Sequence, residues 1–161
     1  MEKYEELLLA LRKVIRAIDL YSKQLNKYSG LTAPQLLILR EIAARDGITA
    51  SQVAQNITLS PATVSNVIER MEHRHLIHRH RSDTDKRRVL LYLTEQGRSL
   101  LSQAPQPLQE DFIEKFQALE EWEQSLLLSS MQRIAAMMDA ERLDAAPVLE
   151  VGSYHKMESG Q

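Results

Sequence analysis

The stretch from Ile48 to Gly97 constrains the fold of this 161-residue chain more than any other segment does. It contains two short helical patterns separated by a turn, then two runs of strand-like alternation with a basic cluster between them. The segment is therefore predicted to form a pair of helices followed by a β-hairpin with a basic tip.

The first helix of this pair is predicted to begin at a capping box. Thr49 and Gln52 can exchange hydrogen bonds between the side chain of each residue and the backbone amide of the other. Ile48 before the cap and Val53 at the fourth helical position have the spacing of a hydrophobic staple. The helix is expected to cover residues 50–56.

The second helix is predicted to begin at Ser60, a favourable N-cap, followed by Pro61, whose missing N–H costs nothing there. Its apolar residues form one stripe for the core, comprising Val64, Val67, Ile68 and Met71. The opposite face carries Ala62, Ser65, Asn66, Glu69, Arg70 and His73. Small and amide side chains come first, which suits a helix whose N-terminal end enters a DNA major groove, where Asn66 can pair with adenine. An ordinary amphipathic helix with a polar surface is the alternative.

The hairpin is predicted from two alternating runs, residues 77–81 and 89–93, with turn-forming residues 82–85 between them. Three consecutive cations follow the turn, namely Lys86, Arg87 and Arg88. An arginine at a hairpin tip can reach into a narrow minor groove, and a neighbouring aspartate can hold it in a fixed pose. A solvated surface hairpin is the simpler alternative, but the basic run follows directly on the capped helix pair.

These residues together resemble the MarR family of bacterial transcriptional regulators. The hairpin signature is Asp85-x-Arg87, followed by Leu93-Thr94-x-x-Gly97. The helix pair matches at Thr49-x-x-Gln52-Val53-Ala54 and Leu59-Ser60-Pro61-x-Thr63-Val64-Ser65. The motifs cover residues 31–97, and the length and layout of the whole chain agree. One departure is Thr58, where many members carry glycine, and a positive φ at that position would strain threonine.

The resemblance implies a mostly α (α+β) fold, with a winged helix-turn-helix DNA-binding domain at residues 31–97 and N- and C-terminal dimerisation helices. It places residues 60–75 in the major groove and the wing, residues 77–93, in the minor groove, with Asp85 orienting Arg87. The family motif does not include Arg70, Arg79 and Arg81. Their positive charge suggests that they either bind DNA phosphates or connect the wing to the second helix of the pair. The candidate DNA-contacting residues are Ser60, Pro61, Ala62, Thr63, Ser65, Asn66, Arg70, Arg79, Arg81, Asp85, Lys86, Arg87 and Arg88.

The distribution of charge along the chain supports a nucleic-acid partner, although the net charge of the whole chain does not. The formal net charge is −2. Residues 60–98 contain eight Lys/Arg and five Asp/Glu, a net charge of +3, so the remainder of the chain carries −5. Basic charge is therefore concentrated on the segment predicted to face double-stranded DNA.

Helical patterns flank the central segment on both sides. Residues 4–27 repeat apolar side chains at threes and fours. The next helix, over residues 33–45, is predicted to begin at a capping box of Thr32 and Gln35 and to bury Leu36, Leu39, Ile42 and Ala43. Beyond the hairpin, a helix from Glu95 is interrupted by Pro105 and Pro107, and further helices are expected at residues 108–118 and 121–141.

The flanking helices carry more apolar surface than a DNA-binding domain of about 60 residues can cover. Residues 1–28 and 98–142 are therefore expected to form a helical dimerisation region, with residues 143–161 as a tail. A twofold homodimer would place two recognition helices about one DNA turn apart and would read an inverted repeat. The alternative is a monomer whose helices pack back on their own domain.

Several other classes of function lack support in the sequence. The chain has no cysteine, which excludes disulfides and thiol sensing, and it shows no catalytic or phosphate-loop motif, so neither an enzyme nor a cofactor is expected. The absence of a signal peptide or an apolar span predicts a cytoplasmic location without a membrane partner. A protein-interaction module on the same fold is the alternative of another class, but it would not need Asp85 and Arg87.

Four of the five histidines lie between His73 and His80. Such a cluster can bind zinc, but no carboxylate or thiol with suitable spacing accompanies it, so no metal site is assigned. A surface cluster beside DNA is the preferred interpretation. Histidines protonate near pH 6.5, so acidification would add positive charge against phosphate.

The regulatory signal is less constrained than the fold. In the family, a small phenolic or other ligand typically binds between the reader and the dimer helices and releases DNA. Residues 20–25, 31–36, 122–125 and 137–140 are similar to a branch that regulates ectoine and other compatible-solute genes, which are tied to osmotic stress. That similarity suggests ionic strength itself as an alternative signal for a repressor.

Overall fold

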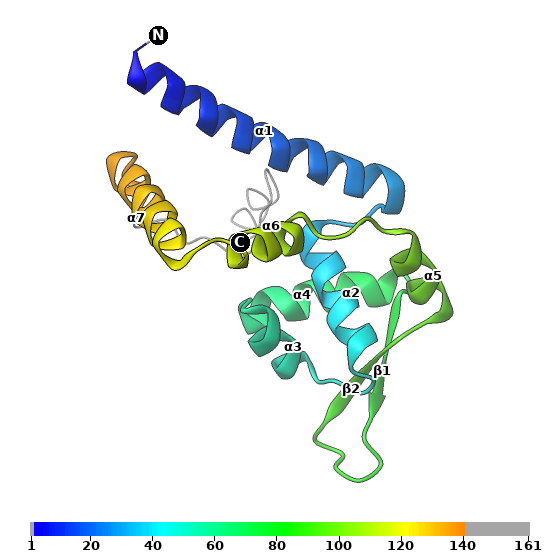
Figure 1. Ribbon diagram of the computed structural model, residues 1–161. Coiled ribbons are helices and arrows are strands. Elements are labelled where there is room, and N and C mark those ends of the chain that lie inside the picture. The colour runs from blue at the N-terminus through cyan, green and yellow to red at the C-terminus, as the bar shows by residue number, and fades with distance from the viewer. Residues whose placement is uncertain (1, 141–161) are drawn as a thin grey trace, which may run out of the picture. The chain divides into compact units, whose positions relative to one another are not determined.

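The computed structural model describes residues 2–140, which divide into two compact units, residues 2–105 and 106–140 (Figure 1). The first unit contains α1 (Lys3–Ser29), α2 (Ala33–Ala44), α3 (Ala50–Ile57), α4 (Pro61–His73), β1 (Ile77–Arg81), β2 (Val89–Leu93) and α5 (Glu95–Gln103). The second contains α6 (Leu108–Gln117) and α7 (Glu121–Met137). The predicted mostly helical fold with a two-stranded antiparallel hairpin is confirmed. The predicted tail, residues 143–161, lies outside the described residues.

Helix α2 is the centre of the first unit, because it packs against α3, α4, α5 and β2. Leu36, Leu39 and Ile42 are buried as predicted. Ile38 is also fully buried, since neighbours cover this helix on several sides. The prediction that Ala43 is buried is wrong: it lies in the last turn of α2 and is exposed.

The predicted helix caps are present. Thr32 and Gln35 form a reciprocal capping box at α2, with N···O distances of 3.4 and 3.1 Å. Thr49 and Gln52 form another at α3, with distances of 3.3 and 3.0 Å. These local hydrogen bonds satisfy amides that have no partner within the helix, so they fix where α2 and α3 begin.

The hairpin is held in register by its buried face. Ile77 pairs with Leu93 and Arg79 with Leu91, and the three apolar residues of these pairs are buried. Ile48 adds one bridge to the sheet, because Leu91 N donates to Ile48 O at 2.9 Å. The wing is therefore attached to the loop before α3 as well as to the end of α4.

Thr58 caps α3 in the left-handed conformation, with φ +56° and ψ +35°. The suspected departure at this position is real, since a β-branched residue occupies a backbone conformation that suits glycine. Helix α3 nevertheless ends in a left-handed cap, in which the Thr58 amide donates to Ala54 O.

Replacing Thr58 with glycine is expected to raise the free energy of unfolding by about 1 kcal/mol. The gain comes from relief of the left-handed strain, reduced by the larger conformational entropy of glycine in the unfolded chain. Urea unfolding followed by circular dichroism measures the change, with Thr58→Ala as the control that should give little gain. A Thr58→Gly variant less stable than the parent would contradict the strain argument.

Helix α1 is amphipathic along most of its length. On its polar side, Lys23 Nζ and Arg16 Nη1 each lie 2.9 Å from Asp19 Oδ2. The hydrogen bond from Lys23 is the main cause that holds the pKa of Asp19 below its usual value. Large apolar side chains such as Val14 and Ile15 are nevertheless exposed in the N-terminal half.

In the second unit, α6 and α7 are likewise rich in exposed apolar residues, including Trp122 at 67% and Leu126 at 58%. The predicted interruption at the two prolines is a complete break, because α5 ends at Gln103 and α6 begins at Leu108. Among the described helices, none combines the length and the apolar character needed to cross a membrane.

Candidate nucleic-acid interface

Helix α4 separates a buried stripe from an exposed polar face. Val64, Val67, Ile68 and Met71 are all buried, as their spacing predicted. The exposed residues of this helix include Pro61, Ala62, Ser65, Asn66, Glu69 and Arg70, and Thr63 is half-buried. The N-terminal end of α4 therefore presents small and amide side chains to solvent, the arrangement that close approach to base edges requires.

The first turn of α4 is ordered by its own hydroxyls. Ser60 Oγ accepts from the Thr63 amide at 3.1 Å and lies 2.7 Å from Thr63 Oγ1. No acidic residue occupies this turn, so the partial positive charge of the helix N-terminus is left for an anion such as phosphate.

The tip of the wing is shaped by Asp85 and Ser82. Asp85 Oδ1 accepts from the backbone amide of Arg87 at 3.0 Å, and the Asp85 amide donates to Ser82 Oγ at 3.2 Å. Arg88 O then accepts from the Ser82 amide at 3.0 Å, which closes the loop. Asp85 thus contacts Arg87, its expected partner, through the backbone amide of that residue.

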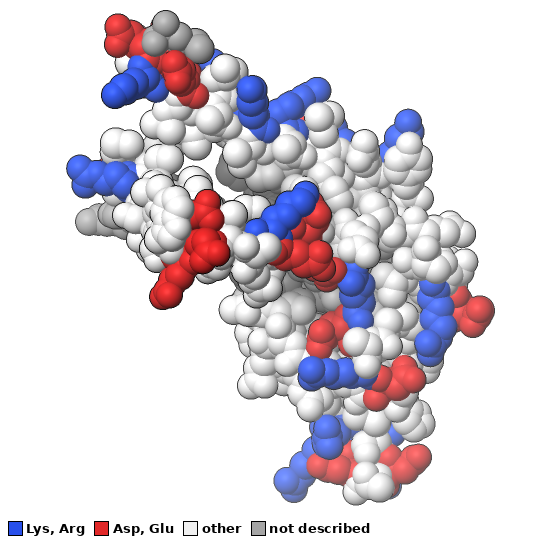
Figure 2. Space-filling view, in the orientation of Figure 1, with Lys and Arg blue, Asp and Glu red and all other residues white. Residues whose placement is uncertain are grey.

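The cations of the wing are free to contact a partner. Arg81, Lys86, Arg87 and Arg88 are all exposed, and within residues 2–140 none of them forms an ion pair with a carboxylate. Figure 2 shows blue side chains gathered at the far end of the wing, with some red ones beside them. This positive charge extends away from the body of the first unit.

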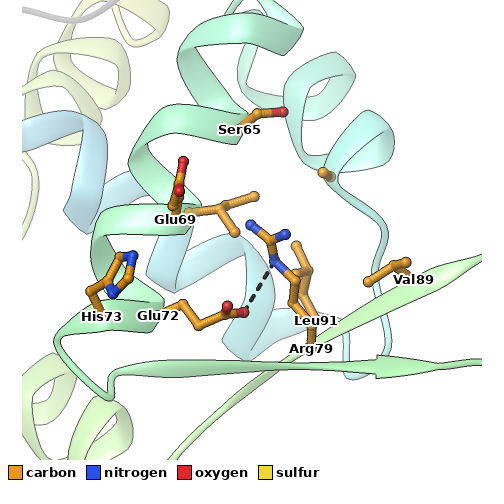
Figure 3. Close-up of a pocket in the computed structure, with 9 residues that line it drawn as sticks. Ser65, Glu69, Glu72, His73, Arg79, Val89 and Leu91 are labelled. Atoms are coloured by element: carbon orange, nitrogen blue, oxygen red, sulfur yellow. Dashed lines mark ion pairs between the residues drawn. The ribbon is translucent and has the colours of Figure 1, made fainter.

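Arg79 connects the wing to α4. Its Nε lies 3.1 Å from Glu72 Oε2, and both side chains are about 40% exposed, at 42% and 41% (Figure 3). Glu72 Oε2 is covered from solvent and has Arg79 as its charge partner, but no hydrogen-bond partner among the described residues. A half-exposed pair of this kind contributes about 1 kcal/mol at most, so its main effect is to set the direction of β1 relative to α4.

A groove of about 390 Å³ lies between α4 and the wing. Its lining residues are Ser65, Ile68, Glu69, Glu72 and His73 of α4, Ala50 of α3, Arg79 of β1, and Val89 and Leu91 of β2 (Figure 3). The predicted site residues thus form two arms, the exposed face of α4 and the wing tip, with this groove between them.

The histidine cluster is divided by the hairpin. His78 and His80 share one face of β1, as predicted, and His78 stacks on Tyr92 with ring centroids 5.5 Å apart. His73 lines the groove on α4 instead, and His75 has a positive φ of +57°. Within the described part of the chain, no three histidine or acidic side chains are grouped as a metal site would need.

Two residues that shape the site are not indicated by the sequence. Glu72 holds Arg79, and Arg74 forms a hydrogen bond to Gly30 O at 3.0 Å, across 44 positions of the chain. Neither contact has a local pattern that would reveal it. From the alternation of β1 one can predict only that Arg79 and Ile77 lie on the same face of the strand. In the structure this face is directed toward α4.

A capped helix pair followed by a two-stranded wing defines a winged helix-turn-helix. The MarR family model matches residues 31–89. Transcriptional regulator HosA of Escherichia coli O111:H- is 33% identical over 110 residues, which cover 68% of this chain and 79% of HosA. HTH-type transcriptional regulator MgrA of Staphylococcus aureus is 32% identical over 97 residues, covering 60% and 66% of the two chains. The chain belongs to the MarR family of DNA-binding transcriptional regulators.

Solved structures share this fold. The regulator PcaV from Streptomyces coelicolor, in complex with its natural ligand, has a TM-score of 0.55 at 24% identity, covering 80% of this chain and 91% of PcaV. FabT from Streptococcus pneumoniae, in complex with DNA, has a TM-score of 0.53 at 20% identity, covering 85% and 98%. The similarity therefore extends to most of the chain and beyond the residues matched by the family model.

Proposed function

We propose that this regulator acts as a twofold dimer that binds an inverted-repeat operator and represses transcription. The observation that carries the proposal is that the exposed, capped face of α4 lies beside a wing whose Arg81, Lys86, Arg87 and Arg88 are exposed and pair with no carboxylate within residues 2–140. A protein-interaction module would need neither an exposed Arg87 at the tip of the wing nor an exposed N-terminal end of α4.

Each half of the operator would be contacted in two grooves. The N-terminal end of α4 would enter the major groove, with Ser65 and Asn66 toward base edges. Arg87 would enter the adjacent minor groove, where its charge is attracted most strongly by narrow A·T segments. The DNA backbone that separates the major groove from the minor groove would cross the protein groove between α4 and the wing, beside Arg79. The ion pair of Arg79 with Glu72 limits the repulsion of phosphate by that carboxylate.

The dimer would be formed by α1 and α7 of two chains. Both helices expose large apolar side chains, Val14 and Ile15 on α1 and Leu126 and Met131 on α7. Several large apolar side chains exposed along one helix favour an interaction site on that helix. A second copy is the natural partner, because twofold symmetry also supplies the pair of recognition helices that an inverted repeat requires.

The genes under control are proposed to serve osmotic adaptation through compatible solutes such as ectoine, and this rests on the sequence resemblance alone. Ionic strength is the proposed signal, because binding dominated by phosphate contacts weakens as salt rises. The competing proposal is release by a small ligand, as the ligand complex of PcaV suggests for a relative of the same fold.

Replacing Arg87 with alanine is expected to lower affinity for the operator by about ten- to a hundredfold, because one arginine is lost from the minor groove in each protomer. Fluorescence anisotropy would be measured on DNA selected from a random pool with the full chain. Arg45→Ala is the matched control: Arg45 is an exposed arginine at the end of α2 whose ion-pair partner, Glu41, lies one turn away. Unchanged binding by Arg87→Ala would remove the wing from the proposed interface.

A further inference from the structure

The C-terminal end of α1 is set into the core of the first unit. Leu25 and Leu31 are fully buried on either side of the corner between α1 and α2, and Ser29 between them is buried too. Ser29 Oγ donates to Leu25 O at 2.6 Å, and the Gly30 amide donates to Asn26 O at 2.7 Å with φ +65°. This end of the helix is therefore fixed in place, while apolar side chains nearer its N-terminus are exposed.

Arg74 joins this corner to the recognition helix. It caps the C-terminus of α4, and its Nη1 donates to Gly30 O at 3.0 Å. A Cβ added to Gly30 would lie 3.3 Å from Arg74 Nη2, which is a tight contact. The guanidinium thus fits against a glycine whose carbonyl is available because the helix ends in a left-handed turn.

A second set of contacts holds the same end of α4 to α5. Thr94 Oγ1 donates to His75 O at 2.6 Å, and the Thr94 amide donates to Leu76 O at 3.0 Å. Gly97 then packs directly against the Leu76 carbonyl. The C-terminal end of the recognition helix, α4, is consequently tied to the start of α5 through Thr94 and Gly97, and to the corner between α1 and α2 through the Arg74 side chain.

We infer that Arg74 is a positioning residue that transmits the direction of α1 to α4 and so sets the spacing between the two recognition helices. This inference rests on the proposed twofold DNA reader, in which α1 lies at the dimer interface. A helix of 27 residues is about 40 Å long, so a small change of angle at its fixed end becomes a large displacement at its far end. Arg74 links α1, the proposed dimerisation helix, to the recognition helix α4 without contacting DNA bases.

The inference is tested with operators whose half-sites are moved apart or together by one base pair. The parent chain is expected to lose about tenfold or more in affinity at an altered spacing. Arg74→Ala is expected to bind the native spacing about fivefold more weakly and to lose most of the discrimination among spacings. Arg74→Gln, which keeps the aliphatic stem, should behave in the same way, and Arg45→Ala should keep the parent profile.

The salt dependence separates a positioning role from a phosphate contact. A residue that contacts phosphate lowers the slope of log affinity against log salt by about one when it is removed. Arg74→Ala is expected to leave that slope unchanged while it flattens the preference for spacing. A lowered slope with an unchanged spacing profile would overturn the inference and make Arg74 an ordinary phosphate ligand.

A measurement without DNA tests the tie independently of the proposed function. Spin labels at Lys13→Cys on α1 and Ala62→Cys on α4, in the full chain diluted with unlabelled chain, report the distance between the helices. The chain has no native cysteine to interfere. The distance distribution should broaden in Arg74→Ala and stay unchanged in Arg45→Ala. Identical widths in Arg74→Ala and the parent would refute the inference, whereas failure of the chain to select any DNA would refute the proposed function instead.

Discussion

Raising the salt concentration from about 50 to about 200 mM is expected to weaken operator binding by about 10³–10⁵-fold. Each phosphate contact releases condensed counterions, and their release is less favourable when the bulk salt is high. Apart from Arg79, which is paired with Glu72, the exposed candidate cations in each protomer are Arg70, Arg81, Lys86, Arg87 and Arg88. A twofold dimer doubles this set, which agrees with the roughly 6–10 phosphate contacts from which the expected loss follows.

The salt effect is measured as the slope of log affinity against log salt at constant pH. Circular dichroism and sedimentation at each salt concentration establish that the chain stays folded and that its oligomeric state does not change. A steep slope in the absence of any ligand supports ionic strength as the signal. A shallow slope, together with release of DNA by one compound at constant salt, would replace that proposal with ligand sensing.

Replacing Gly97 with alanine is expected to lower the free energy of unfolding by about 3 kcal/mol, at the upper end of the usual cost of overpacking. A Cβ at this position would lie 2.0 Å from the Leu76 carbonyl oxygen and 3.0 Å from its carbon. The obstacle is backbone, and Leu76 O also accepts the Thr94 amide, so neither side can move without breaking the contact between α4 and α5.

The Gly97 prediction is checked by urea unfolding, with Ser99→Ala as its control. Ser99 lies on the same helix and is exposed, so alanine there adds a good helix former without a clash. The control should change stability by about 0.5 kcal/mol or less. Equal or higher stability of Gly97→Ala would mean that α5 does not pack against the end of α4 in this way.

The sequence predicted well those features that depend on neighbours in the chain. The capping boxes at Thr32 and Thr49, the buried stripe of α4 and the strand alternation are local patterns, and all are confirmed. The strain at Thr58 was also foreseeable, because the turn between two helices restricts the backbone conformation of its cap.

Contacts between distant segments could not be predicted in the same way. Arg74 and Gly30 are far apart in the chain, and nothing in either segment marks the other as its partner. The motif indicated Arg87 as the partner of Asp85 but not the atom that Asp85 contacts, because a carboxylate two residues before an amide can bind that amide as readily as the side chain. Ala43 was placed on the buried stripe by spacing, although the α2 stripe turns out of the core before the helix ends.

Dimeric reading of an inverted repeat is tested by a hydroxyl-radical footprint of the full chain on the DNA upstream of its own gene, at low salt. We expect two protected half-sites of related, inverted sequence, centred about 10 base pairs apart or a multiple of that distance. Protection should extend into the flanking minor grooves and disappear there selectively in Arg87→Ala. Uniform weak protection without a symmetric site would contradict a dimeric reader of an inverted repeat.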